Sequence, residues 1–470
     1  MMKKLLLTLI VAITAISCTN IEKCETSIPY DIVNGKIVFE TPERVPGQKS
    51  VLGLRTEPME VVRVGFIGLG MRGPGAVERF THIEGVEIKA LCDLYPERAA
   101  AAQKILENKG LPKATEYSGE YGWKELCLRD DIDLVYIVTP WQNHVEMAVY
   151  AMENGKHAAV EVPAATNLDE CWQLVNTAEK TQRHCTILEN CVYDFFEMTA
   201  LNMAQQGLFG EILHVEGAYI HNLEPFWDEY QGNWRLEFNQ KHRGDVYATH
   251  GFGPVCQVLN IHRGDKLDHL VAMDTKSVNG TKLVKERMGL DECANGDHTI
   301  TLIRTSKGKL IEIQHNVMTP RPYNRLYQLT GTEGFANKYP IQGFTFLPEN
   351  ISKDEVPDHE DLNAHGFIPA DARDALMAKY MHPIHKEVGE IAKKVGGHGG
   401  MDFVMDYRLI YCLRNGLPLD MDVYDAAEWS CVAELGAVSM FHSSMPVEYP
   451  DFTRGEWDRT EGFQFATIEK

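Results

Sequence analysis

A glycine-rich turn is the first segment whose residue types point to a defined chemistry. Gly68, Gly70 and Gly73 form a G-x-G-x-x-G pattern between an apolar run and a helical segment. Such glycines permit a tight turn, close approach of a pyrophosphate and close packing of the helix on the strand. Asp93 ends the next apolar run, where its carboxylate can bind ribose hydroxyls and repel a 2′-phosphate. The spacing predicts an NAD site, and an ordinary strand–helix turn is the alternative.

A tyrosine and a histidine form a second candidate site, in the later half of the chain. Tyr247 and His250 stand three residues apart in the segment RGDVYATHG, and they share one face if this segment opens a helix. A histidine titrates near neutral pH, and a polarised tyrosine can donate or accept a proton. Both are therefore candidate acids or bases. A core histidine and a packing tyrosine are the alternative interpretation.

The elements that must position the glycine turn alternate between strand-like and helix-like segments. We expect strands at 61–67, 86–92, 133–138, 157–162 and 184–188, and helices at 75–80, 96–109, 146–154 and 168–182. Strands and helices that alternate at this spacing predict an α/β domain, a Rossmann-type doubly wound parallel sheet spanning 61–189.

The segments after residue 190 have a different character. One helix at 195–206 leads into expected strands at 212–219, 270–272, 298–305, 309–316 and 325–331, and the tail is helical at 375–395, 402–415 and 424–442. Strand-rich material after an α/β unit predicts a second, α+β domain over 190–470, with a mostly antiparallel open sheet.

The N-terminus has the features of an export signal. Lys3 and Lys4 precede an apolar stretch at 5–16 that is too short to span a bilayer, and Ser17 stands just before Cys18. This pattern predicts a lipoprotein-type signal at 1–18 and an exported protein anchored to a membrane only through a lipid on Cys18. A plain secretory signal is the alternative. The polar, proline-punctuated segment 19–60 is expected to be a tether and N-terminal arm.

Composition and charge exclude several classes of protein. The 470 residues include 44% hydrophobic and 24% charged residues, which excludes a wholly disordered chain, a collagen-like fibre and a multi-span membrane protein. The net charge of −21 argues against nucleic acid as a partner. No cysteine pair has C-x-x-C spacing, so we expect no metal site. The cysteines permit disulfides, but Cys92, Cys412 and Cys431 lie in apolar runs typical of buried free thiols.

Three segments together resemble the glucose-fructose oxidoreductase/inositol dehydrogenase (Gfo/Idh/MocA) superfamily. They are the strand with its glycine turn, Thr139-Pro140 followed by His144, and Glu161-Val162-Pro163. Dehydrogenases of that superfamily usually carry Glu-Lys-Pro, whose lysine lies beside the nicotinamide and the reacting hydroxyl. Val162 replaces that lysine here, and Trp141 also departs from the usual Thr-Pro-Asn segment. A desolvated lysine is a good base for alcohol oxidation, so its loss argues against an ordinary dehydrogenase.

A longer set of motifs resembles glycoside hydrolase family 109, the family of NAD-dependent α-N-acetylgalactosaminidases. The motifs are Met71-Arg72, Trp141-Gln142-Asn143-His144, Glu161-Val162-Pro163, Asn190, Tyr247-Ala248-Thr249-His250-Gly251, Pro320-Arg321-Pro322-Tyr323 and the tail at 451–455. They occur in this order from about residue 61 onward and so cover nearly all of the expected mature chain.

The resemblance implies a reaction and a set of site residues. The expected NAD ligands are Gly68, Gly70, Met71, Arg72, Gly73, Asp93, Trp141, Gln142, Asn143, His144, Glu161, Val162, Asn190 and Tyr247. The expected substrate contacts are Tyr219, Arg235, Tyr247, Ala248, Thr249, His250 and Tyr323, and the candidate acids and bases are His250, Tyr247 and Tyr193. A tightly bound, recycled NAD would oxidise the sugar at carbon 3, allow elimination of the aglycone and, after water adds, reduce carbon 3 again.

Several alternatives stay open at this point. A sugar oxidoreductase with net turnover and a non-catalytic, NAD-bound sugar-binding lipoprotein are the other candidate functions. Val162 argues against the first, and the Tyr247–His250 pair argues against the second. Arg235 could form a surface salt bridge instead of a sugar contact, and Tyr193 could be structural. The glycine cluster at 396–400, with His398 inside it, predicts either a loop over the site or a helix terminator. A homo-oligomer is compatible with the resemblance.

Overall fold

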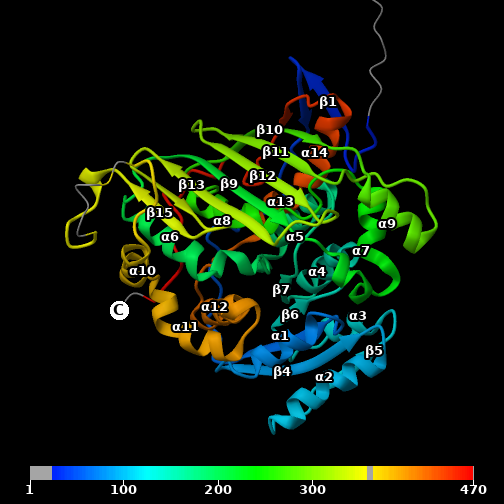
Figure 1. Ribbon diagram of the computed structural model, residues 1–470. Helices are drawn as coiled ribbons and strands as arrows, with labels where there is room; N and C mark the ends of the chain where they lie inside the picture. The colour runs from blue at the N-terminus through cyan, green and yellow to red at the C-terminus, as the bar shows by residue number, and fades with distance from the viewer. Residues whose placement is uncertain (1–23, 357–361, 363, 469–470) are drawn as a thin grey trace, which may run out of the picture.

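The computed structural model describes residues 24–356, 362 and 364–468 (Figure 1). The expected signal at 1–18, with Cys18, lies outside the described residues, as does the start of the expected tether. Within the described part, no helix combines the length and the apolar character needed to cross a bilayer. The ten cysteines of this part, including Cys92, Cys412 and Cys431, are all free thiols.

The nucleotide domain is a six-stranded parallel sheet, which confirms the predicted Rossmann fold. Its strands run in the order β5-β4-β3-β6-β7-β8, and β6 and β7 are buried along their whole length. The bounds are β3 (Val62–Ile67), β4 (Val86–Asp93), β5 (Thr115–Ser118), β6 (Leu134–Ile137), β7 (His157–Val160) and β8 (Cys185–Ile187). The sequence prediction lacked the edge strand β5, because its polar, mostly exposed residues do not form an apolar run.

Helices cover both faces of this sheet, as in other doubly wound folds. Pro74 and Pro96 lie in the first turns of two of them, where the missing backbone N–H costs no hydrogen bond. The Asn167 side chain caps a third helix by accepting a hydrogen bond from the Glu170 backbone N–H. The helices are α1 (Gly73–Phe80), α2 (Pro96–Asn108), α3 (Gly122–Cys127), α4 (His144–Glu153) and α5 (Leu168–Thr181).

The second domain is built on a ten-stranded, mostly antiparallel sheet, as predicted. The strand order is β1-β2-β16-β10-β11-β12-β9-β13-β14-β15, with parallel pairing only for β12–β9 and β16–β2 among these strands. The bounds are β9 (Ile212–Ile220), β10 (Leu267–Asp274), β11 (Thr299–Thr305), β12 (Leu310–Asn316), β13 (Asn324–Gly331), β14 (Gly334–Asn337), β15 (Gly343–Phe346) and β16 (Val447–Glu448).

Helices α6, α8 and α13 lie between the large sheet and the nucleotide domain (Figure 1). The start of α8 touches the sheet closely, because Gly217 of β9 faces Gly251. A Cβ on Gly251 would lie 2.1 Å from the Ala218 backbone nitrogen, so only glycine fits there. This contact fixes the residue before it, His250, relative to the sheet. The helices of this domain are α6 (Phe195–Gln205), α7 (Trp234–Lys241), α8 (Thr249–Val258), α9 (Asn279–Met288), α10 (Ala370–Lys379), α11 (Pro383–Val395), α12 (Met401–Asn415), α13 (Val423–Ser430) and α14 (Val432–Phe441).

The N-terminal arm is more ordered than the expected tether over 19–60. Residues 30–39 form a hairpin of β1 (Tyr30–Val33) and β2 (Lys36–Phe39), and β2 joins the large sheet through β16. Asn34 and Gly35 make its turn with φ of 53° and 77°. An Asn-Gly pair between two strand-like runs is a strong hairpin signal, and the prediction of a tether and N-terminal arm did not include this hairpin.

Two expected tail helices are each divided in two. The segment expected as one helix at 375–395 is α10 and α11, with a break before Pro383. His382 has the extended backbone that a following proline favours, and its side chain caps α11. The segment expected at 424–442 is α13 and α14, separated by the single residue Cys431.

Candidate active site

A cavity of about 1100 Å³ lies between the nucleotide domain and the second domain. Its wall includes the glycine turn, the ends of β4 and β6, residues just after β9 and the first turn of α8. A volume at the top of the usual range for ligand pockets leaves room for a dinucleotide and a second ligand. It is also the place where ligands of open α/β sheets bind, outside the carboxyl ends of the strands.

The glycine turn has the shape that a dinucleotide requires. Gly68 has a φ of 94°, and a Cβ there would lie 2.5 Å from the Val138 carbonyl oxygen. A Cβ on Gly73 would lie 2.1 Å from the Gly68 carbonyl oxygen, so helix and strand pack through this glycine. At Gly70 a Cβ would meet only the flexible Arg98 guanidinium, at 3.4 Å. The backbone at Gly70 is thus open to a pyrophosphate, and these residues fit NAD.

Asp93 lies at the end of β4, beside the glycine turn, as the sequence predicted. Its Oδ2 accepts a hydrogen bond from the Leu69 backbone N–H at 2.7 Å, and its Oδ1 accepts one from Tyr95 at 3.0 Å. Arg98 Nη1 lies 3.5 Å from the same carboxylate. The carboxylate is therefore held in place at the wall of the cavity, where ribose hydroxyls can reach its remaining lone pairs.

Aromatic rings surround Arg235 on one side of the cavity. Tyr247 stacks on Trp141 with ring centres 5.3 Å apart, and the Arg235 guanidinium lies 4.4 Å from the Tyr247 ring centre. Arg235 donates a hydrogen bond to the Tyr230 hydroxyl at 2.7 Å, but its buried Nε has no partner in the described structure. Arg235 is 5% exposed, which rules out the surface salt bridge considered above. Its Nε is thus an unsatisfied buried donor behind the cavity wall, which Arg235 itself lines.

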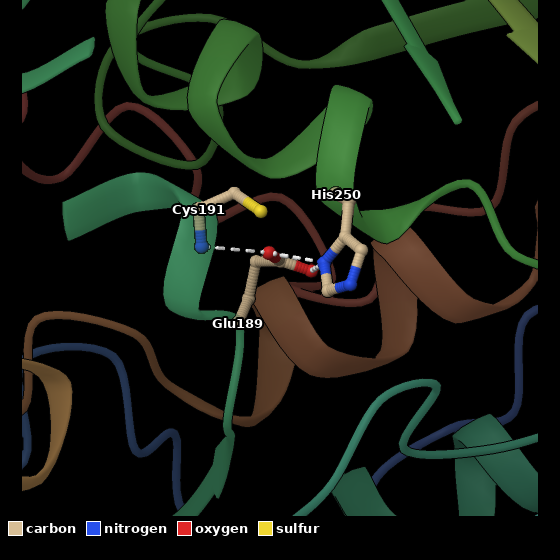
Figure 2. Close-up of side chains that lie close together, drawn as sticks. All are labelled: Glu189, Cys191 and His250. Atoms are coloured by element: carbon tan, nitrogen blue, oxygen red, sulfur yellow. Dashed lines mark hydrogen bonds and ion pairs between the residues drawn. The ribbon is translucent and has the colours of Figure 1, made fainter. Parts of the chain in front are cut away.

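His250 is paired with a carboxylate that the sequence prediction missed. Its Nδ1 lies 2.7 Å from Oε1 and 3.0 Å from Oε2 of Glu189, and Figure 2 shows Nε2 pointing away from that carboxylate. Glu189 is completely buried, whereas the His250 side chain retains 11% exposure and lines the cavity. The one available signal was position, since Glu189 lies two residues after the last Rossmann strand, β8, and directly precedes Asn190.

Cys191 completes a small cluster with this pair (Figure 2). One donor atom each of Glu189, Cys191 and His250 lies within 4.8 Å of the others, a spacing that a metal ion could use. Burial raises the pKa of the Cys191 thiol well above its ordinary value, and the thiol donates to the Asn190 side-chain oxygen at 3.3 Å. Because the thiol keeps its proton and the carboxylate is already paired with His250, we interpret the cluster as a histidine–carboxylate hydrogen bond beside a neutral thiol.

Asp402, at the start of α12, anchors the opposite rim of the cavity. Asn190 Nδ2 donates to Asp402 Oδ1 at 2.5 Å, and His398 Nδ1 lies 2.9 Å from Oδ2. The Arg72 guanidinium contacts the His398 ring. The glycine cluster both ends α11 and forms a loop at the cavity, so the two expectations for it are compatible. The positive φ values are 90°, 84°, 46°, 74° and 108° for residues 396–400.

Most of the sequence-predicted site residues line the cavity. His144 lines it with a ring fixed between two carbonyl oxygens, at 2.8 Å from Pro163 and 2.7 Å from Thr139, so its role is to join these two turns. The predicted residues in the wall are Gly68, Gly70, Met71, Arg72, Asp93, Trp141, Gln142, Asn143, His144, Glu161, Val162, Asn190, Tyr219, Arg235, Tyr247, His250 and Tyr323.

Four predicted residues are not in the wall of the cavity. Gly73 acts through helix packing, and Ala248 and Thr249 are buried. Tyr193, expected as a candidate acid or base, is 2% exposed and donates to Asp420 Oδ2 at 3.1 Å, beside Arg408. The expected catalytic role of Tyr193 is therefore incompatible with its position. Spacing from Asn190 suggested that role, but a short 3-10 turn at Asn190–Tyr193 directs the side chain into the interior.

Other wall residues had no sequence signal of their own. His221 follows β9 and packs edge-on against Tyr323, with ring centres 5.1 Å apart. Phe226 and Tyr230 come from the segment between β9 and α7, and Trp234 is the first residue of α7. Lone aromatic residues in an irregular segment show no periodicity, so only the folded chain reveals that they gather around one cavity.

Two family models match the chain. The glycosyl hydrolase 109 C-terminal domain matches residues 193–459, and the oxidoreductase-family NAD-binding Rossmann fold matches residues 62–188. The chain is 61% identical to glycosyl hydrolase family 109 protein 1 of Bacteroides thetaiotaomicron over 471 residues, with 100% of each chain covered. It is 63% identical to the glycosyl hydrolase family 109 protein of Porphyromonas gingivalis over 436 residues, covering 92% of this chain and 93% of that one.

Solved structures share the fold at low identity. A levoglucosan dehydrogenase in complex with NADH superposes with a TM-score of 0.60 at 18% identity, covering 83% of this chain and 99% of that one. The WlbA dehydrogenase of Bordetella pertussis, in complex with NADH and UDP-GlcNAcA, gives 0.60 at 14% identity with the same coverage. The chain therefore belongs to glycosyl hydrolase family 109, as an NAD-dependent glycoside hydrolase with the fold of the Gfo/Idh/MocA oxidoreductases.

Proposed function

We propose that this enzyme hydrolyses terminal α-N-acetylgalactosamine, or a related hexosamine, by a route with no net redox change. The observation that carries the proposal is the His250–Glu189 pair, in one cavity with the NAD turn and with Val162 where dehydrogenases carry lysine. A histidine base beside a cofactor site can remove the proton from carbon 2 of a sugar that has been oxidised at carbon 3. The two opposed carboxylates of common glycosidases are not needed for this route.

The chain supplies distinct groups for binding and for proton transfer. Bound NAD would supply a hydride acceptor and donor for the sugar's carbon 3. The open backbone at Gly70, the Asp93 carboxylate and the wall residues Arg72 and Trp141 are the groups that would hold it. Arg235, whose side chain lines the cavity, would donate to an oxygen of the sugar.

His250 is the best placed base for the hydrogen at carbon 2 of the sugar. Its Nε2 points away from Glu189 (Figure 2), and the ring lines the cavity. Burial raises the pKa of the Tyr247 hydroxyl well above its ordinary value, although Arg235 opposes this. Tyr247 therefore keeps its proton and serves as a hydrogen-bond donor rather than a base. Val162 is apolar and 4% exposed, so it transfers no proton.

The bond changes take place at carbons 1, 2 and 3 of the sugar. Oxidation of the 3-hydroxyl to a ketone would pass a hydride from carbon 3 to bound NAD and release the hydroxyl proton to solvent. The ketone would acidify the hydrogen at carbon 2, which His250 would remove as a proton. The carbon 1–oxygen bond to the aglycone breaks, and the aglycone oxygen takes up a proton. Water then adds across carbons 1 and 2, its oxygen to carbon 1 and a proton to carbon 2. Reduction at carbon 3 restores the hydroxyl, so the net reaction is hydrolysis.

The decisive experiment uses the purified enzyme with a chromogenic α-N-acetylgalactosaminide and no added NAD. Release of the aglycone, followed together with NADH absorbance, distinguishes the three candidate functions. Release without net NADH is expected. Stoichiometric NADH formation on the free sugar would instead establish a net oxidoreductase, and neither signal on a panel of hexosaminides would leave a sugar-binding protein.

A solvent-isotope experiment tests the route independently of the substrate assignment. In deuterium oxide, the released sugar should carry deuterium at carbon 2, because His250 removes that hydrogen and a solvent-derived proton replaces it. Mass spectrometry or NMR of the product measures the incorporation. Hydrolysis with protium retained at carbon 2 would refute the elimination route.

We further propose that the enzyme is exported and anchored through a lipid on Cys18, on the strength of the N-terminal pattern alone. The expected outcome is partition of the full-length protein into the detergent phase of a Triton X-114 extract. The C18A variant should then appear in the aqueous phase. Aqueous partition of both proteins would favour a plain secretory signal.

A further inference from the structure

We infer that Glu189 is a positioning residue that holds His250 with its proton on Nδ1 and so directs Nε2 toward the sugar. This inference rests on the proposed function of His250 as the base, but it concerns Glu189, which is completely buried and does not line the cavity. Glu189 acts only through the imidazole, in the manner of the carboxylate in a Ser-His-Asp arrangement.

The hydrogen bond between His250 and Glu189 can run in only one direction, from Nδ1–H to the carboxylate. Both carboxylate oxygens of Glu189 lie within 3.0 Å of His250 Nδ1, and Oε1 also accepts the Cys191 backbone N–H at 3.0 Å. An ionised carboxylate accepts hydrogen bonds and donates none. A neutral His250 must therefore carry its hydrogen on Nδ1, which leaves the lone pair on Nε2, the atom on the cavity side.

The charge of Glu189 is maintained in spite of its burial. Burial alone would raise the pKa of this carboxyl, but His250 and the hydrogen bonds to it hold the pKa below its ordinary value. An anion that is completely buried beside the imidazole stabilises the imidazolium that forms when His250 accepts a proton. Glu189 therefore acts in two ways, on the tautomer of His250 and on its basicity.

Packing holds the carboxylate in this orientation. Gly253, one turn beyond His250 in α8, faces the Glu189 side chain. A Cβ at Gly253 would lie 3.1 Å from Cγ of Glu189 and 3.0 Å from the Trp429 ring, so Glu189 is confined between α8 and α13. On the other side of the pair, Gly251 fixes α8 against β9. Rigid support of this kind is what a catalytic side chain requires from the residues behind it.

Several other aromatic and titratable groups face His250 from the elements packed around it. Tyr219 and Tyr247 face the imidazole with their rings, at centre distances of 5.4 Å and 5.0 Å. His221 lies beyond them, and the neutral Cys191 thiol is beside Glu189. A side cavity that His250 also lines brings in the remaining charged or titratable groups, which are Arg72, Arg79, Glu161, His398 and Asp402.

The test compares Glu189→Gln with Glu189→Asp in the full enzyme. Glutamine keeps the volume but loses the charge, and its amide can present either a carbonyl or an NH₂ to Nδ1. For E189Q we expect kcat to fall on the order of 100-fold with KM little changed, and the acidic limb of the kcat/KM profile to move to lower pH. E189D keeps the charge and should recover part of kcat and the original acidic limb.

A spectroscopic readout separates positioning from stability and from the proposed function. In protein labelled with ¹⁵N-histidine, the His250 signals, assigned by their loss in H250N, should show protonated Nδ1 in the wild type and a mixture of tautomers in E189Q. Glu179→Gln is the matched control, because Glu179 is equally buried but pairs with Arg44 and Arg454. E179Q should lower the Tm while leaving the His250 signals and the pH profile unchanged.

The outcomes are distinct. An E189Q enzyme with the wild-type tautomer and pH profile would overturn the positioning role, whatever its Tm. If the wild type hydrolyses no hexosaminide, the proposed function fails instead, and the His250 signals in wild type and E189Q alone decide the positioning of the ring.

Discussion

Two histidine–glutamate pairs flank helix α8 and differ in what each leaves accessible. At the start of the helix, His250 pairs through Nδ1 with Glu189, and its side chain keeps 11% exposure at the cavity wall. Beyond the end of the helix, His262 pairs through Nε2 with Glu428, and the two side chains are 1% and 2% exposed. The same two residue types thus occur within a few residues of one helix, in two different surroundings.

The difference shows what makes such a pair a candidate for catalysis. His262 is enclosed on all sides, and Glu428 raises its pKa to about 9 even though burial lowers it. It therefore stays an imidazolium at neutral pH, committed to one partner and with no path to a ligand. His250 uses one nitrogen for its carboxylate and leaves the other toward a cavity. Access for the second nitrogen, rather than the pairing itself, distinguishes an acid–base group from a structural ion pair.

Removing each imidazole in turn should give the largest difference between the His250–Glu189 and His262–Glu428 pairs. His250→Asn should lower kcat/KM by about 10²- to 10⁴-fold, because the reaction loses its general base. His262→Asn should leave kcat/KM of the folded enzyme unchanged. Steady-state kinetics on a chromogenic hexosaminide, with folded protein quantified by circular dichroism, makes the comparison. Equal losses of activity in both variants would mean that the two pairs do not differ in function.

Removing one carboxylate should reveal the structural cost of the enclosed pair. Glu428→Gln leaves a buried imidazolium without its anion and should lower the free energy of unfolding by about 3–5 kcal/mol. The double variant His262→Leu/Glu428→Gln should be less destabilised, because no unpaired charge remains. Urea denaturation of the three proteins provides the values. A single variant as stable as the wild type would show that the pair contributes no stability.

The sequence predicted the nucleotide domain and its turn because those features are local. A G-x-G-x-x-G run, an apolar strand and Asp93 stand within about thirty residues, and one βα unit fixes their geometry. The resemblance supplied most of the cavity residues, including Arg235 and Tyr323. Two features depended on long-range packing instead. Glu189 becomes recognisable as a partner only when α8 brings His250 to it. Tyr193 stands three residues after Asn190, which predicted a place at the sugar, but its hydroxyl faces Asp420.

The titration of His262 offers a graded test of the contrast. Its pKa of about 9 in the folded state exceeds the ordinary 6.5, so its contribution to stability is complete below pH 6.5 and is lost as the pH rises through 9. The shift corresponds to roughly 3 kcal/mol of unfolding free energy. Wild-type stability should fall over this range more than that of the His262→Leu/Glu428→Gln variant. Parallel curves of unfolding free energy against pH for the two proteins would show that His262 is not the group that titrates over this range.

Two tyrosines also differ in whether they face the cavity or the interior, and the smallest effect on stability is expected for the interior one. Tyr247 lines the cavity, whereas the Tyr193 hydroxyl donates to Asp420 in the interior. Tyr193→Phe removes one hydrogen bond to a charged group and should lower the free energy of unfolding by about 1–3 kcal/mol, with kcat unchanged. Arg408 still pairs with Asp420 through two hydrogen bonds of 2.7 Å, so the carboxylate keeps a charged partner and the loss of stability stays near the lower value.

Tyr247→Phe should do the opposite, lowering kcat/KM with little change in stability. A large fall in kcat for Tyr193→Phe would reinstate Tyr193 as a candidate acid or base and would require the chain around Asn190 to move during turnover.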